Sequence, residues 1–287
     1  MPLIHSYTHG NGGLGDFLRS LFAYYVYCKI HEIPYYLFIK GHPFEFCFKQ
    51  IPIPEMYLKD LKTFRDVGSS SDKQTEDILN RIKKENCLVI SNKFDFIHMD
   101  LLKKHRTDFL KFLELTDPVN TRIKFLMNFY NLDELSFNSI HIRLGDKLMK
   151  NVNVASDIRI KDNTSFNNDF SLGLKFLRSN KPIVIFTDNT NLKNQLKINK
   201  TIKIDPHTVI DVTLLDTSIE HTALHNIDTI SAIDTIAEFY IMGLSENIVT
   251  LSSSGFSFWS SFLFNRDLYR VSDGRVVPFL ETDLKYK

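Results

Sequence analysis

The sequence lacks an excess of charge of either sign. Its 35 lysine and arginine residues are balanced by 34 aspartate and glutamate residues, which gives a formal net charge of +1. Proteins that bind nucleic acids or anionic membranes by electrostatics usually present a strongly basic surface. We therefore expect neither a nucleic-acid partner nor a membrane surface as a partner.

Cysteines and long apolar runs are also scarce. The three cysteines, Cys28, Cys47 and Cys87, lack the paired spacing of a zinc site, and we assign them no chemistry. No run is long enough to span a bilayer, and Met1 to Ser6 lacks the basic and apolar regions of a secretory signal. The expectation is a soluble cytoplasmic protein without stable membrane insertion.

The apolar residues that are present follow an α/β pattern. A short strand over 3–7, a glycine-rich loop, a helix over 16–31 and a strand over 35–39 form a βαβ opening, which requires a parallel sheet. The second half repeats this rhythm. Two α/β domains are expected, 1–134 and 135–287. Further strands are predicted over 87–91, 139–143, 183–187, 202–204, 247–251 and 268–271, further helices over 101–130, 169–178, 191–197, 230–244 and 255–265, and long polar loops over 67–76 and 151–168.

Polar groups collect where the strand over 139–143 ends. His141 and Arg143 close this strand, and a tight Gly-Asp turn with Asp146 follows. In parallel α/β sheets, ligands bind at this carboxyl edge, where an arginine can present its planar fork of donors to a diphosphate. By spacing alone, an ion pair between Arg143 and Asp146 is the simpler interpretation.

The loop between the first strand and the first helix is a second candidate. Its glycines, Gly13 and Gly15 among them, allow backbone N–H groups and a helix N-terminus to approach phosphate oxygens. Asp16 would then open the helix. A plain tight turn with Asp16 as N-cap explains the pattern about equally well.

Two further strand ends carry polar groups. Ser253 and Ser254 form a hydroxyl-rich turn before a helix that includes Phe256 and Ser257, and Asp188 follows the strand over 183–187. Each cluster alone fits an ordinary helix cap or turn. Four such clusters at the ends of separate predicted strands together favour a nucleotide-binding cleft.

These residues resemble a known family. His141-Ile-Arg-Leu-Gly-Asp146 is similar to the HxRxGD motif of α1,2-, α1,6- and protein O-fucosyltransferases. The segments 12–16, 184–189 and 238–259 resemble the glycine loop, the "FTD" strand end and the serine-rich tail of the same superfamily, in the same order. The resemblance implies a GT-B-like fold, in which two Rossmann-like α/β domains face a cleft.

The resemblance also implies an activity and its residues. The implied reaction is an inverting transfer of fucose from GDP-fucose to a hydroxyl of a glycan acceptor, with the donor on the C-terminal domain and the acceptor on the N-terminal domain. Arg143 would bind the diphosphate and support its departure, while His141 and Glu238 would face the guanine and ribose. Asp234, one helical turn before Glu238, is an alternative partner of the base. Ser253, Ser254, Phe256 and Ser257 would surround the nucleotide and phosphate.

No metal cofactor is expected, because the sequence has no clear DxD cluster and its acidic residues near these motifs are scattered. Asp16 is a candidate base for the acceptor hydroxyl.

Three alternatives remain at this point: a GT-B enzyme with another nucleotide-sugar donor, an inactive relative that binds nucleotide or glycan, and a nicotinamide-dependent oxidoreductase.

Overall fold

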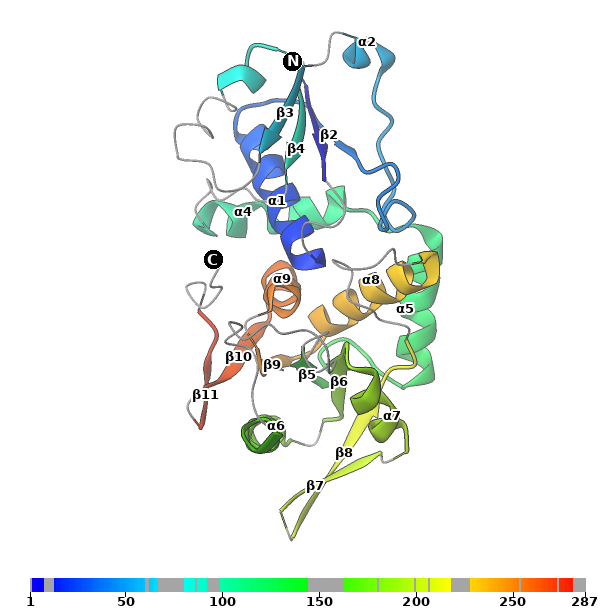
Figure 1. Cartoon of the computed structure of the whole chain (residues 1–287), viewed down its shortest axis with the longest axis vertical. Helices are drawn as coiled ribbons and strands as arrows, with labels where there is room; N and C mark the ends of the chain where they lie inside the picture. The colour runs from blue at the N-terminus through cyan, green and yellow to red at the C-terminus, as the bar shows by residue number, and fades with distance from the viewer. Residues whose placement is uncertain are drawn as a thin grey trace. The chain divides into compact units, whose positions relative to one another are not determined.

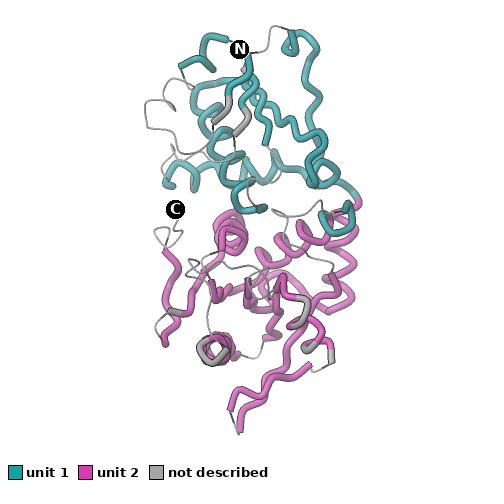
Figure 2. The backbone as a smooth tube through the Cα atoms, in the orientation of Figure 1, with its two compact units in different colours: residues 1–117, 222–232 teal, residues 118–221, 233–287 magenta. Residues whose placement is uncertain are grey.

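The computed structural model describes most of the chain and divides it into two compact units. One unit holds residues 1–117 and 222–232, and the other holds residues 118–221 and 233–287 (Figure 2). The assignment of 1–134 to the acceptor and 135–287 to the donor stays a prediction. The described residues are 2–7, 13–59, 62–66, 80–85, 87–91, 99–143, 163–179, 181–198, 200–205, 207–217, 228–252, 254–272 and 274–280.

The first unit contains a parallel sheet in the strand order β2-β1-β4-β3 (Figure 1). Helix α1 connects β1 to its parallel neighbour β2, which confirms the predicted βαβ opening. The strands are β1 (Leu3–Ser6), β2 (Tyr35–Phe38), β3 (Lys62–Asp66) and β4 (Cys87–Ser91), and the helices include α1 (Leu14–Ile30), α2 (Glu55–Leu58) and α4 (Met99–Phe112).

Aromatic side chains build much of the core of this unit. Tyr24 and Cys28 on α1 are fully buried and pack with Val89 of β4. On another face of α1, the ring of Phe22 stacks on that of Phe109 from α4, with centroids 4.2 Å apart. Burial raises the pKa of the Cys28 thiol, so this cysteine behaves as a small hydrophobic residue, as its surroundings in the sequence indicate.

The mostly helical character predicted over 101–130 is confirmed, but it is divided between two helices, α4 and α5 (Asp117–Phe129). Leu115 pairs with Phe48 in an isolated bridge between them, and the Thr116 hydroxyl donates to the Phe46 carbonyl at 2.8 Å. Pro118 lies in the first turn of α5, where a helix tolerates proline because the N–H that proline lacks would have no partner within the helix. The helical spacing of apolar residues thus continues from α4 into α5, although the pairing of Leu115 with Phe48 interrupts the helix between them.

The second unit contains a larger sheet in the order β11-β10-β9-β5-β6-β8-β7. Its four central pairings are parallel, and antiparallel pairs, β10 with β11 and β8 with β7, lie at the two edges. The strands are β5 (Asn138–Ile142), β6 (Ile183–Thr187), β7 (Thr201–Asp205), β8 (Thr208–Leu214), β9 (Asn247–Thr250), β10 (Asp267–Ser272) and β11 (Arg275–Pro278).

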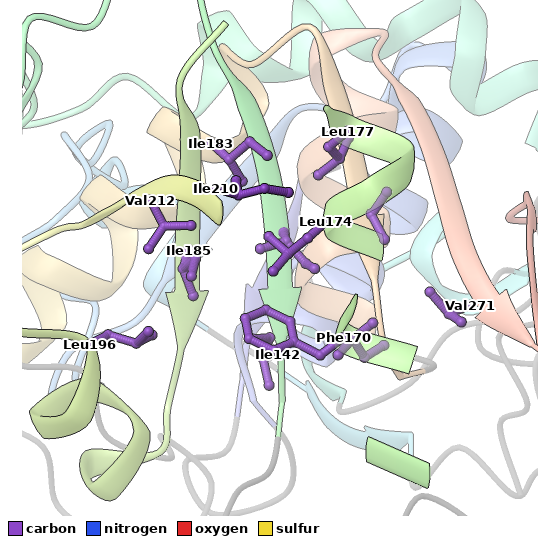
Figure 3. Close-up of a cluster of buried hydrophobic side chains, with 13 residues drawn as sticks. Ile142, Phe170, Leu174, Leu177, Ile183, Ile185, Leu196, Ile210, Val212 and Val271 are labelled. Carbon is purple, nitrogen blue, oxygen red and sulfur yellow. The ribbon is translucent and has the colours of Figure 1, made fainter. Parts of the chain in front are cut away.

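Helix α6 (Asn163–Leu177) covers one face of this sheet. Its buried residues Phe170, Leu174 and Leu177 pack against isoleucines and valines of the central strands (Figure 3). Because helices cover a parallel sheet on both faces, its central strands are buried along their whole length, as β5 and β6 are. The other helices that the structure describes in this unit are α5, α7 (Thr190–Ile198), α8 (Thr229–Gly243, which begins in the first unit) and α9 (Gly255–Phe264).

Three strands of the structure have no counterpart in the prediction from sequence: β3, β8 and β11. β3 and β11 are edge strands with many polar residues, so they carry little apolar signal. β8 contains β-branched residues that alternate with polar ones, so its sequence pattern predicts a strand that the sequence analysis missed. The predicted loop over 151–168 is wrong for residues 163–168, which belong to α6.

Candidate functional site

The polar strand ends of the second unit meet at one edge of its sheet. Strands β9, β5 and β6 are parallel neighbours, so their carboxyl ends lie side by side. His141 and Arg143 stand at the end of β5, Asp188 follows β6, and Ser254 lies between β9 and α9. The tertiary structure thus brings together three of the four clusters that the sequence indicates.

Arg143 and Asp188 form an ion pair across this edge. Arg143 Nη1 lies 3.8 Å from Asp188 Oδ2, and the two side chains are 25% and 8% exposed. The aspartate therefore holds the guanidinium at the strand ends while leaving part of it open to solvent. The predicted partner, Asp146, lies outside the described residues.

His141 is buried beside this pair. Its ring lies 5.3 Å from that of Phe256, which in turn contacts Phe239 edge to face. Nδ1 has no hydrogen-bond partner among the residues that the structure describes. Burial lowers the pKa of His141 to about 4, against the opposing effect of Asp188 and with a smaller contribution from Arg143. The imidazole is therefore neutral at pH 7, with one ring nitrogen available as an acceptor or donor.

Helix α9 starts at the same edge. Ser254 is its N-cap, with its hydroxyl accepting from Phe256 N at 3.3 Å, and Ser257 Oγ donates to the Ser254 carbonyl. Both hydroxyls thus serve the helix end, as the simpler interpretation of this turn expects. The first turn still presents backbone N–H groups at a helix N-terminus, which suits an anion. Ser253 lies outside the described residues.

Glu238 on α8 is a buried carboxylate in a small polar cluster. It accepts a hydrogen bond from Thr217 Oγ1 and lies 3.9 Å from Lys193 Nζ on α7. Burial raises the pKa of Glu238 to about 7, a shift that Lys193 and Thr217 oppose and that Asp234 and Asp188 reinforce. The group therefore changes its charge near neutral pH.

Asp234, the alternative to Glu238 in the sequence, is already engaged by an arginine. Arg122 Nε donates to Asp234 Oδ1 at 2.6 Å, and Nη2 donates to the Asp216 carbonyl at the same distance. The Asp234 side chain is only 2% exposed. This aspartate ties α5 to α8, whereas Glu238 has the weaker cationic partner.

The sequence alone missed the partners of the two carboxylates on α8, which are Lys193 and Thr217 at Glu238 and Arg122 at Asp234. Lys193 belongs to α7. Nothing in the sequence distinguishes it from the surface lysines nearby, but the residue is only 8% exposed. Thr217 follows β8, the neighbour of β6 in the sheet. Recognition of β8 as a strand would have placed a fourth polar strand end, Asp216-Thr217, next to Asp188.

The glycine-loop candidate belongs to the other unit. The N-cap of α1 is Gly13, so the interpretation of Asp16 as the N-cap is wrong. Asp16 lies in the first turn of the helix, where its negative charge interacts favourably with the helix dipole. Gly15 is buried in that turn. Residues 8–12 of the loop lie outside the described residues, and the role of Asp16 as a base stays a prediction.

Two negative findings apply to the described residues alone. They contain no group of three or more histidine, cysteine, aspartate or glutamate side chains that can hold a metal ion. Within them, no helix has both the length and the apolar character needed to cross a membrane.

No protein-family model matches the sequence, and no curated protein matches it. Solved structures do match. NodZ α-1,6-fucosyltransferase from Bradyrhizobium, co-crystallised with GDP, is 12% identical, with a TM-score of 0.63 over 97% of this chain and 98% of that one. A mutant of Arabidopsis thaliana FUT1 in complex with GDP is 13% identical, with a TM-score of 0.54 over 96% of this chain and 72% of that one. POFUT1 in complex with GDP is 9% identical, with a TM-score of 0.53 over 94% and 99%.

Likeness at these identities establishes a shared fold. The expected GT-B-like α/β fold is confirmed, and the resemblance to the fucosyltransferase superfamily is confirmed at the level of the fold. The likeness extends over nearly the whole chain, so both α/β units belong to the shared fold.

Proposed function

We propose that this protein is a glycosyltransferase that moves fucose from GDP-fucose to a hydroxyl group of a glycan. The observation that carries the proposal is the position of His141, Arg143 and Asp188 at adjacent strand ends, in a fold shared with fucosyltransferases crystallised with GDP. This edge is where parallel α/β sheets bind their ligands.

Arg143 is the proposed diphosphate ligand. Its guanidinium lies 3.8 Å from Asp188 and its side chain is 25% exposed, so its exposed part can approach phosphate oxygens. The N-terminus of α9 supplies further N–H donors at the same edge. Together they can balance the charge that develops on the departing diphosphate, without a metal ion.

Glu238 is the proposed partner of the base. Guanine presents two adjacent N–H donors, at N1 and N2, which an ionised carboxylate accepts as a pair. Asp234 is less suited, because its oxygens already accept from Arg122. The rings of His141 and Phe256 lie next to each other and offer the nucleotide apolar ring faces and one imidazole nitrogen.

The proposed reaction is a single displacement. The bond between the fucose anomeric carbon and the β-phosphate oxygen breaks, the acceptor oxygen bonds to that carbon from the opposite face, and the acceptor proton passes to a base. Asp16 is our candidate for that base, with Gly13 and Gly15 shaping the loop before it. Asp146 and Ser253 complete the proposed donor site. The cytoplasmic location likewise stays a prediction.

Thermal stabilisation by nucleotides tests the donor site. The parent and Arg143→Ala are melted with GDP, GDP-fucose, GDP-mannose, UDP and NAD. We expect GDP and GDP-fucose to raise the Tm of the parent, because a ligand that binds only the folded state stabilises it by mass action, and we expect the variant to lose this shift.

Stabilisation by NAD alone, or by UDP in place of the guanine nucleotides, would contradict the proposal. A larger shift with GDP-mannose than with GDP-fucose would retain the guanine site but change the sugar. An acceptor screen with the preferred donor then measures transfer against hydrolysis, which separates an enzyme from an inactive binding relative.

A further inference from the structure

Lys193, Thr217 and Glu238 form a closed triangle from three different elements. Lys193 Nζ donates to the Thr217 carbonyl at 3.1 Å, the Thr217 hydroxyl donates to Glu238, and the lysine nitrogen lies 3.9 Å from the Glu238 carboxylate. The lysine and glutamate side chains are 10% and 4% exposed. A charge pair this deeply buried has a strong effect on whether each partner is ionised.

In the part of the chain that the structure describes, the other charged groups that influence Glu238 are aspartates. Asp188 approaches from the end of β6, and Asp234 lies one turn away on α8; both disfavour a second negative charge. The cation of Arg122 is turned toward Asp234, which it binds from Nε and Nη2. Lys193 is therefore the cation placed to favour the ionised form of Glu238.

The charge of Glu238 decides which base it can pair with. An ionised carboxylate only accepts, so it suits guanine, which presents N1–H and N2–H donors side by side. A neutral carboxylic acid both donates and accepts, so it suits adenine, which presents the N1 acceptor beside the N6–H donor. One side chain can therefore favour either purine, according to its proton.

We propose that Lys193 is a specificity-determining residue of the donor site, which favours the ionised, acceptor-only form of Glu238 and so biases the site toward guanine over adenine nucleotides. The inference rests on the proposed function, since it places the base at Glu238. Lys193 acts through Glu238, as a positioning residue, and does not need to touch the nucleotide. It lies in none of the motifs that resemble the fucosyltransferases.

Calorimetric titration of the full chain with GDP and with ADP from pH 5.5 to 9 tests this role. For the parent, we expect GDP affinity to fall by about tenfold per pH unit below the Glu238 midpoint, while ADP affinity does not fall. Lys193→Met removes the charge, so its GDP profile should move to higher pH by about one unit, with about a tenfold lower ratio of GDP to ADP affinity at pH 7. At pH 9 the parent and variant should converge.

Four variants complete the test. Lys193→Gln keeps a donor for the Thr217 carbonyl and replaces Lys193→Met if that variant does not fold. Lys193→Arg keeps the charge and the guanine preference. Glu238→Gln removes the pH dependence altogether. Lys175→Met, on α6 and paired with Asp205, is the matched lysine control and keeps the parent profile.

An equal loss of GDP affinity at every pH would show that Lys193 only supports the structure, and an unshifted profile would show no role; either result overturns the inference but leaves the proposed function intact. Failure of the parent to bind GDP at any pH overturns both.

Discussion

Arg122 and Asp234 join α5 to α8 through a hydrogen-bonded ion pair with a 2.6 Å contact between Nε and Oδ1. The carboxylate is nearly inaccessible, whereas the guanidinium is 28% exposed. Arg122 also binds the Asp216 carbonyl, and the Asp216 N–H donates to Tyr130 Oη. The pair therefore fixes the end of β8 as well as the two helices, and it separates the roles of Asp234 and Glu238.

Replacement of Asp234 should affect stability more than ligand binding. Asp234→Asn leaves Arg122 without its charged partner, and we expect the free energy of unfolding to fall by about 3 kcal/mol, as for other broken buried ion pairs. Urea denaturation of the single variants and of Arg122→Met/Asp234→Asn measures the coupling. Additive losses in the double variant would show that the two residues do not act as a pair.

Arg143 should be required for the chemical step. Arg143→Ala leaves the developing diphosphate charge unmatched, and we expect kcat to fall by about 150-fold, or about 3 kcal/mol in the barrier. Arg143→Lys should restore only part of the rate, because an ammonium group cannot present a planar fork of donors. Arg178→Ala, at an exposed position after α6, is the control for loss of a positive charge. Equal rates for Arg143→Ala and this control would exclude the proposed role.

The buried carboxylate of Glu238 should make the folded state less stable as the pH rises. Its pKa is about 7 in the folded protein against 4.5 for an unperturbed glutamate, so the folded state binds the proton more tightly than the unfolded state. This contribution is fully present below pH 4.5 and is lost as the pH rises through 7. Relative to Glu238→Gln, the parent should lose about 3 kcal/mol between pH 4.5 and pH 8. Parallel stability curves for the two proteins would refute the shift.

Gly243 should not accept a side chain. Gly243 is the last residue of α8, and a Cβ atom at this position would lie 2.3 Å from the ring of Phe264, the last residue of α9. We expect Gly243→Ala to lower the free energy of unfolding by about 2 kcal/mol, as overpacked cores do, and Phe264→Leu to recover part of this loss in the double variant. Thermal or urea unfolding measures both effects. Full stability of Gly243→Ala would show that the ring moves aside without cost.

Metal chelation should leave transfer unaffected. The proposed site neutralises the diphosphate with Arg143 and the N-terminus of α9, so we expect equal initial rates in excess EDTA and in Mg²⁺ or Mn²⁺. A transfer assay with the donor identified by melting makes the comparison. Loss of activity in EDTA that Mn²⁺ restores would contradict this prediction.

The order of elements could be predicted from local pattern where strands are central and apolar. β1, β5, β6 and β9 were each predicted within a residue or so of their ends, because each contains isoleucine or valine residues, which are enriched in strands. The edge strands β3 and β11 could not be found in this way, since half-exposed strands carry polar residues. The break between α4 and α5 was missed because Leu115 bonds with Phe48, which is distant in sequence.

The sequence by itself determined the α/β class, the βαβ opening, and the positions of His141, Arg143 and Asp188 at strand ends, because these depend on periodicity and on neighbours along the chain. Only the tertiary structure decided that these ends are adjacent, that Asp188 lies beside Arg143, and that Arg122 engages Asp234 while Lys193 faces Glu238. Strand order and helix packing bring residues together across dozens of positions in the sequence. Pairings of this kind, and the burial that shifts the pKa of Glu238, leave no local pattern in the chain.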